Sequence, residues 1–186
     1  MNNQKGMTLI ELIIVVVIMG VMFIMAIPTF TSTSHSKLKS AVRDVATELQ
    51  MARMKAIYRN VEFRVLFSPG SPFGYKLEKG NKASGSDTWT NDHAAVAGYN
   101  TSSACSSSSL NANGYFCIEG VTITVTGSLS SGAQFNTNGT SSSGSIRFKN
   151  LNDSNDKSYI SLSDTTGRVN IVDCTKVTGD TICGAF

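Results

Sequence analysis

Residues 7–30 have the sequence MTLIELIIVVVIMGVMFIMAIPTF, and this stretch decides the class of the protein. Its one charged residue is Glu11, which is followed by sixteen consecutive residues without a charge, 12–27. About 20 apolar residues are enough to cross the hydrocarbon core of a bilayer, so the length predicts a membrane segment. A carboxylate near hydrocarbon costs on the order of 2.5–3.5 kcal/mol, so Glu11 is predicted to be functional and to need a cationic partner.

Two simpler interpretations of this segment leave Glu11 unexplained. A secretory signal peptide needs a basic start, which Lys5 supplies, and an apolar stretch of about 7–15 residues before a small-residue cleavage site. The apolar stretch here is longer, and residues 28–30, Pro-Thr-Phe, do not form such a site. A plain membrane anchor fits the length but gives the carboxylate no role.

The segment KGMTLIEL at residues 5–12, followed by an apolar run, resembles the processing motif of type IV pilins and pseudopilins. The resemblance implies that a prepilin peptidase cleaves after Gly6 and that the new first residue, Met7, is N-methylated. It also implies that Glu11 pairs with the N-terminal amine of a neighbouring subunit in a filament. Pro28 matches a position at which pilins often carry a proline that bends the helix.

A second helical pattern follows in residues 36–60, SKLKSAVRDVATELQMARMKAIYRN. Apolar residues recur at steps of three and four, which predicts a helix with one buried face that packs on an αβ head. The end of this segment, followed at once by a strand, resembles the GspH/FimT branch of the pilins, which includes pseudopilin H of type II secretion and the FimT and FimU minor pilins. The predicted buried stripe is Leu38, Ala41, Val42, Val45, Leu49, Ala52, Ala56 and Ile57, and the residues that carry the resemblance are Leu49, Ala52, Arg53, Ala56, Ile57, Arg59 and Asn60.

After residue 60 the hydrophobic period changes from helical to alternating, which predicts short strands. Residues 80–113 are polar, with Trp89 as the only large apolar anchor, and predict a long surface loop. Six or seven antiparallel strands on one long helix give an α+β fold, the pilin ladle with a β-sheet or sandwich head. The predicted segments are a leader (1–6), a transmembrane and assembly helix (7–30), an amphipathic helix (31–60) and a β-rich head (61–186), and the predicted strands lie at 61–67, 73–79, 115–127, 133–135, 145–150, 158–163 and 168–172.

All four cysteines follow the apolar segment. None forms a CxxC pair, and His35 and His93 are the only histidines, so the sequence gives little support for a metal site. Short separations favour two local disulfides in an oxidising compartment, although four cysteines allow three pairings. Free thiols in a cytosolic protein are the alternative, and they conflict with a membrane anchor. The favoured pairs are Cys105–Cys117 and Cys174–Cys183.

Charge and motifs argue against nucleic-acid binding. Residues 1–60 hold seven basic and three acidic residues, whereas residues 61–186 hold nine basic and ten acidic ones and carry −1. Residues 133–172 resemble the second half of the GspH/FimT domain, in which Gly167 and Arg168 match. In the FimT proteins implicated in DNA uptake a second basic residue follows two positions later, where this chain has Asn170. We therefore expect Gly167 to be a turn glycine with positive φ and Arg168 a solvated charge, with a weak DNA contact at Arg168 as the alternative.

No catalytic motif or phosphate-binding loop is found in the sequence. The sequence therefore predicts a protein that is not an enzyme and that needs no cofactor. The sequence thus predicts a minor pilin or pseudopilin in the bacterial inner membrane, with a single span and a periplasmic head. Its expected partners are other pilins, the prepilin peptidase and methyltransferase, and the assembly platform. A DNA-binding minor pilin for natural transformation and an unprocessed single-pass adhesin are the alternatives. Pilus and secretion roles are not separated by the sequence.

Overall fold

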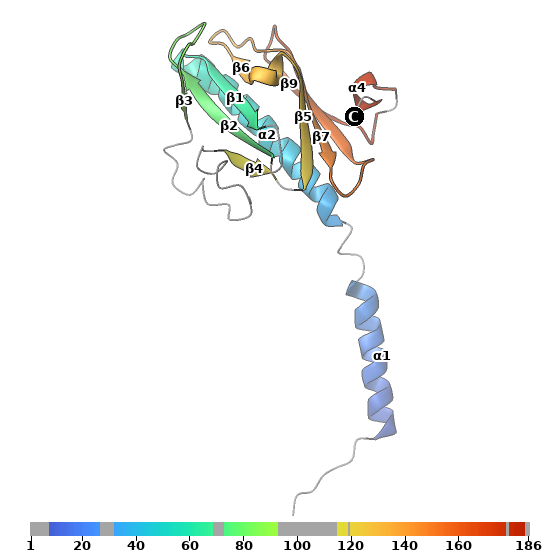
Figure 1. Ribbon diagram of the computed structural model, residues 1–186. Coiled ribbons are helices and arrows are strands. Elements are labelled where there is room, and N and C mark those ends of the chain that lie inside the picture. Colours follow the sequence, from blue (N-terminus) through green and yellow to red (C-terminus); the bar gives the residue numbers. More distant parts are fainter. Residues whose placement is uncertain are drawn as a thin grey trace, which may run out of the picture. The chain divides into compact units, whose positions relative to one another are not determined.

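The computed structural model describes residues 8–26, 32–68, 73–92, 115–118, 120–177 and 179–184 (Figure 1). The chain forms two compact units, residues 1–33 and 34–186. Gly6, Met7, Pro28 and Cys105 lie outside the described residues, so what the sequence predicts for them remains a prediction.

The first unit contains α1, Leu9–Ala26, an 18-residue helix that follows from the uninterrupted apolar run. The apolar side chains of residues 9–22, the described ones in this helix, are exposed on all sides, as for Leu9 at 79% and Val17 at 59% exposure. No helix in the described part of the chain is both long and apolar enough to cross a membrane. The predicted membrane segment, 7–30, extends past α1 at both ends into residues outside the described part.

The second unit is built on α2, Ser32–Arg59, a helix of 28 residues. The predicted stripe is buried along its length, including Leu38, Val45 and Leu49 at 1% exposure or less. Ile57 is the exception at 50% exposure, and Glu48, expected off the stripe, is buried at 5%. The helical period shows which residues share a face of α2, but it does not show how far the head extends over that face at these two positions.

Two antiparallel sheets accompany α2. In the first, β1 pairs with β2 and β6, and β2 pairs also with β3 and β4; the second has the order β5-β7-β8-β9. A short 3₁₀ helix, η2, follows β5, and α4 lies near the end of the chain. The bounds are β1 Phe63–Ser68, β2 Phe73–Gly80, β3 Trp89–Asn91, β4 Phe116–Ile118, β5 Val121–Gly127, η2 Ser128–Ser131, β6 Ala133–Phe135, β7 Gly144–Asn150, β8 Lys157–Leu162, β9 Val169–Asp173 and α4 Thr181–Gly184.

One hydrophobic core joins the helix and both sheets. Phe63 and Phe135 from the first sheet, Phe148 and Ile160 from the second, and Leu49 from α2 are all fully buried. Each such side chain contributes about 1.5–3 kcal/mol by leaving water, so the core fixes α2 against the head. The predicted α+β class is confirmed, with a helix packed on antiparallel sheets.

The structure differs from the predicted strand pattern in two places: the strand predicted at 115–127 is found as two strands, β4 and β5, and β3 lies within the stretch predicted as a loop. Nine strands are found among the described residues, where six or seven were expected. β3 pairs with β2, with Trp89 opposite Gly80. Its three residues are too few to show a period of two in the sequence.

Candidate functional site

Glu11 lies in the first turn of α1 and is exposed. The backbone N–H groups of Glu11 and Leu12 donate to the carbonyl of Thr8 at 3.1 and 3.3 Å, which closes this turn. An acid in the first turn is favoured by the positive end of the helix dipole. Within the described part of the chain Glu11 is the only charged residue of α1. The structure therefore presents one carboxylate at the head of an otherwise apolar helix.

The β8–β9 turn holds the predicted pair Gly167 and Arg168. Gly167 has a φ of 60°, as expected for a turn glycine, and its N–H donates to the carbonyl of Ser163 at 2.8 Å. A Cβ at this position would collide with the carbonyl oxygen of Gly139 and approach Arg53 Nε to 3.2 Å. Gly167 is thus required by both its backbone angle and the close approach of two other segments.

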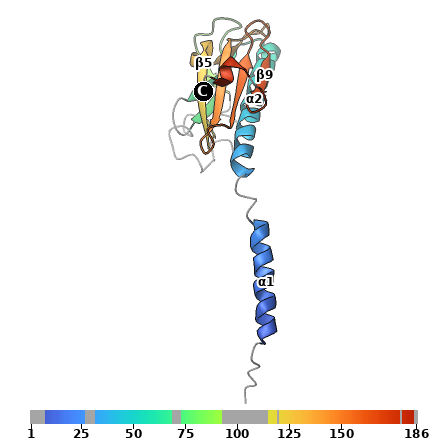
Figure 2. The same cartoon turned by 90° about the vertical axis from the view of Figure 1, so that its right-hand side faces the viewer.

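Arg168 borders a pocket of about 290 Å³ between α2 and the start of β9. Figure 2 shows α2 running alongside β9 in the second unit. Arg53 lines the same pocket from the helix. Its Nε is buried and has no hydrogen-bond partner within the described residues. Two arginines that are far apart in the sequence thus line one hollow. The lining residues are Gln50, Arg53, Met54, Ile57, Gly167, Arg168 and Val169.

The C-terminal loop is closed by a disulfide between Cys174 and Cys183, with Cα atoms 5.5 Å apart. Asp180 ties this loop to the sheet, since its Oδ2 accepts a hydrogen bond of 2.7 Å from the hydroxyl of Tyr159 in β8. The same carboxylate accepts from the N–H of Ile182 and so caps α4. The hydrogen bond from Tyr159 lowers the pKa of Asp180 and raises that of Tyr159.

The predicted pair Cys174–Cys183 is therefore confirmed. Cys117 in β4 is also disulfide-bonded. Its predicted partner, Cys105, lies outside the described residues, so the pairing Cys105–Cys117 remains a prediction. Within the described part no group of three or more potential metal ligands is found.

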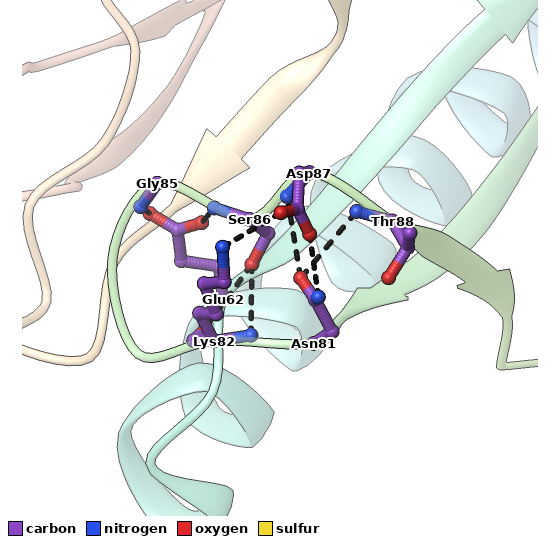
Figure 3. A network of polar contacts seen from close by, with 7 residues as sticks. All are labelled: Glu62, Asn81, Lys82, Gly85, Ser86, Asp87 and Thr88. Carbon is purple, nitrogen blue, oxygen red and sulfur yellow. Dashed lines mark hydrogen bonds and ion pairs between the residues drawn. The ribbon is translucent and has the colours of Figure 1, made fainter.

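Glu62 organises the loop between β2 and β3 (Figure 3). Its carboxylate, 1% exposed, accepts hydrogen bonds from the N–H groups of Gly85 at 2.9 Å and Ser86 at 2.7 Å. Its backbone N–H donates to the carbonyl of Lys82, and its own carbonyl accepts from the N–H of Gly80. Burial opposes the charge, but the hydrogen bonds from Ser86 and Gly85 outweigh it and hold the pKa of Glu62 below its ordinary value.

A second acid closes the same loop from outside. Asp87 accepts hydrogen bonds from Asn81 at 2.5 Å and from Lys82 at 2.7 Å, and the Asn81 side chain also accepts from the N–H groups of Asp87 and Thr88 (Figure 3). This loop leads directly into β3 and positions Trp89, over whose ring the Arg64 guanidinium lies at 4.2 Å. The network supports the loop and shows no chemistry of its own.

Two family models match the chain. Residues 1–27 match the prokaryotic N-terminal methylation motif, and residues 41–166 match the family described as type II transport protein GspH. The chain belongs to the GspH family. The motif at its N-terminus indicates a prepilin with an N-terminal membrane anchor. GspH proteins are structural, pilin-like subunits, so this family member is not an enzyme.

The GspH-family chain is similar to one curated protein in sequence and to one solved structure in fold. The pilin-like protein PilA1 of Thermus thermophilus is 40% identical over 58 residues, which are 31% of this chain and 36% of that relative. The chain thus matches about a third of the relative's length. The minor pseudopilin EpsH from the type 2 secretion system of Vibrio cholerae aligns with 74% of this chain and 97% of its own, with a TM-score of 0.52. At 11% identity that likeness concerns the fold.

The turn glycine Gly167, the exposed Arg168 and the C-terminal disulfide could be predicted from the sequence, but two features of this GspH-family head could not. Glu62 alternates with apolar residues in the strand predicted at 61–67, which predicts an exposed position, yet it precedes β1 and is buried. The meeting of Arg53 with Arg168 depends on how α2 packs beside β9, for which the sequence carries no signal. The alternation of β1 was correct from Phe63 onward.

Proposed function

We propose that this chain is a minor subunit of a type IV pilus or type II secretion filament, and that it acts by packing in filament initiation or in the tip complex. The observation that carries the proposal is Glu11, a single carboxylate at the head of a helix that is apolar on every side. Such a helix needs apolar surroundings, and its acid needs a cation. A neighbouring subunit of the same type offers both.

Cleavage after Gly6 would create that cation as the amine of Met7. In a bundle of apolar helices the dielectric constant is low, so attraction between the amine and a carboxylate of another subunit is strong. A carboxylate left without a partner there is penalised, which selects the one register that pairs it. A single polar group sets register in coiled coils for the same reason. Glu11 would thus position each incoming subunit along the filament axis.

The expected location is the bacterial inner membrane, with one span and the head on the periplasmic side. The Cys174–Cys183 disulfide supports this side, because disulfides persist in oxidising compartments. The expected partners are the major and minor pilins, the prepilin peptidase and methyltransferase, and the inner-membrane assembly platform. Methylation would fall on Met7, within the stretch that matches the methylation motif.

Replacement of Glu11 tests the proposal. Glu11→Gln removes the charge and keeps the size, whereas Glu11→Asp keeps the charge. We expect Glu11→Gln to be cleaved and inserted into the membrane like the parent, but to enter sheared filaments at least about tenfold less, since loss of a buried pair costs more than about 1.4 kcal/mol. Glu11→Asp should retain part of the assembly. The readouts are immunoblots of filament and membrane fractions and the mass of the N-terminal peptide. Incorporation of Glu11→Gln at the parental level would refute the proposed role.

A further inference from the structure

The pocket between α2 and β9 has features of a binding site, and its exposed side chains are not part of the hydrophobic core. Its helix side comes from Gln50, Arg53, Met54 and Ile57, which are spaced so that they share one face of α2. Met54 is 70% exposed and Ile57 50%, although both are large and apolar. The buried stripe of α2 therefore continues at its edge into a half-open apolar surface.

The two arginines of this pocket have no acidic partner among the residues that the structure describes. Neither Arg53 nor Arg168 forms an ion pair within the described residues, and the Nε of Arg53 is buried without an acceptor. Other arginines on this head do have partners: Arg59 pairs with Asp92 and Arg64 with Glu78. A buried donor on a charged group is costly when it is left unpaired, so an acceptor bound in this pocket would stabilise Arg53.

Two backbone turns lie close to the Arg53 side chain. Gly167 and Gly139 both have positive φ, and an added Cβ on either would lie against the Arg53 side chain, at 3.2 Å from Nε for Gly167 and 3.6 Å from Nη2 for Gly139. The absence of side chains at these two positions leaves room for the arginine. A side chain added at either position would crowd the Arg53 guanidinium, whose planar group suits recognition of a planar anion.

We propose that this pocket, the Arg53–Arg168 pocket, binds a protein carboxylate, an Asp or Glu side chain with an apolar neighbour, from another pilin-type subunit. A carboxylate would take the guanidinium groups, and its apolar neighbour would cover Met54 and Ile57. This inference rests on the proposed role as a filament subunit. It adds a second contact, in the head, to the one made by Glu11.

The charges favour a carboxylate on a protein over the phosphates of a nucleic acid. Non-specific binding of DNA needs several cationic side chains along an open surface. Each phosphate that they neutralise releases about one counterion from the DNA. The pocket offers two arginines beside apolar side chains. Two arginines that line one pocket are enough to bind one carboxylate, whereas a phosphate backbone needs several cations along its length.

The test uses the full chain in detergent micelles, labelled with ¹³C at the methionine methyl groups, and follows the Met54 signal, assigned with Met54→Leu. The probes are the peptide acetyl-Leu-Glu-Leu amide, its matched Gln peptide, inorganic phosphate and a short duplex DNA. We expect the Glu peptide to shift the Met54 signal and to bind at least about tenfold more tightly than the Gln peptide.

Arg168→Gln, on an exposed residue, should remove this preference, and Arg53→Lys should weaken it because lysine lacks the planar fork. Arg43→Gln, on the exposed side of α2, is the matched control and should leave binding unchanged.

Three results would overturn the proposal. They are no shift with the Glu peptide, equal binding of the Glu and Gln peptides, and tighter binding of phosphate or DNA than of the Glu peptide that is lost in Arg168→Gln. The assay requires no filament, so its failure leaves the role of Glu11 standing. Conversely, normal assembly of Glu11→Gln would refute the proposed function whatever the peptide does.

Discussion

Replacement of Glu62 by glutamine should destabilise the head markedly while changing a single atom. The carboxylate accepts hydrogen bonds from Gly85 and Ser86 in a site that is 1% exposed. Glutamine keeps one oxygen and turns an NH₂ group toward the other N–H. One bond to a charged acceptor, worth about 1.5–3 kcal/mol, is lost and the second falls to the strength of a neutral bond, about 1 kcal/mol. The expected loss in unfolding free energy is about 2–5 kcal/mol.

A loss of this size should lower the melting temperature by about 4–20 °C for a domain of this length. Trp89, the one tryptophan in the chain, follows the loop that Glu62 holds, so its fluorescence reports the region directly. Asp87→Asn is the control: it removes an acid from the same loop at an exposed position and should change the melting temperature far less. Equal melting of Glu62→Gln and the parent would show that these hydrogen bonds do not stabilise the head.

The same carboxylate should make stability depend on pH. The folded-state pKa of Glu62 lies below its ordinary value of 4.5, so the stability that it contributes is present above pH 4.5 and is lost as the pH falls through the folded-state pKa. The parent should therefore lose melting temperature on acidification more steeply than Glu62→Gln, and the two should approach each other in strong acid. Parallel curves over this range would contradict the assignment.

Three further predictions concern the head and are read out by denaturant unfolding. Gly167→Ala should lose at least about 1–2 kcal/mol, because alanine disfavours positive φ and its Cβ would collide with the carbonyl of Gly139; parental stability would contradict this. Cys174→Ser with Cys183→Ser should lose up to about 3 kcal/mol, as expected for a loop of this length, and unchanged stability in oxidising buffer would contradict it. Leu49→Ala should lose about 2.7–5 kcal/mol because this side chain is fully buried, and a loss below about 1 kcal/mol would show that the core collapses around it.

Elements with strong local patterns could be predicted from the sequence. The helical period of residues 38–56 predicts the buried face of α2, and alternation predicts β7 and β8 to within a residue or two. The short strand predicted at 133–135 has the same bounds as β6. In each case the residues that define the pattern are also those that are buried, so local sequence and tertiary packing agree.

Features that depend on pairing between distant segments could not be predicted. β3 has three residues and exists because β2 offers an edge for it. Glu62 is buried because Gly85 and Ser86, more than twenty residues later, supply its N–H donors. The Arg53–Arg168 pocket is likewise a product of packing between α2 and β9, and neither arginine is distinctive alone.

The mass of the mature N-terminal peptide tests the central claim most directly. If the chain is a processed pilin-type subunit, the peptide from assembled material begins at Met7 and carries one added methyl group. A peptide that begins at Met1 would contradict the account, because Glu11 would then have no N-terminal amine at the position that pairing requires.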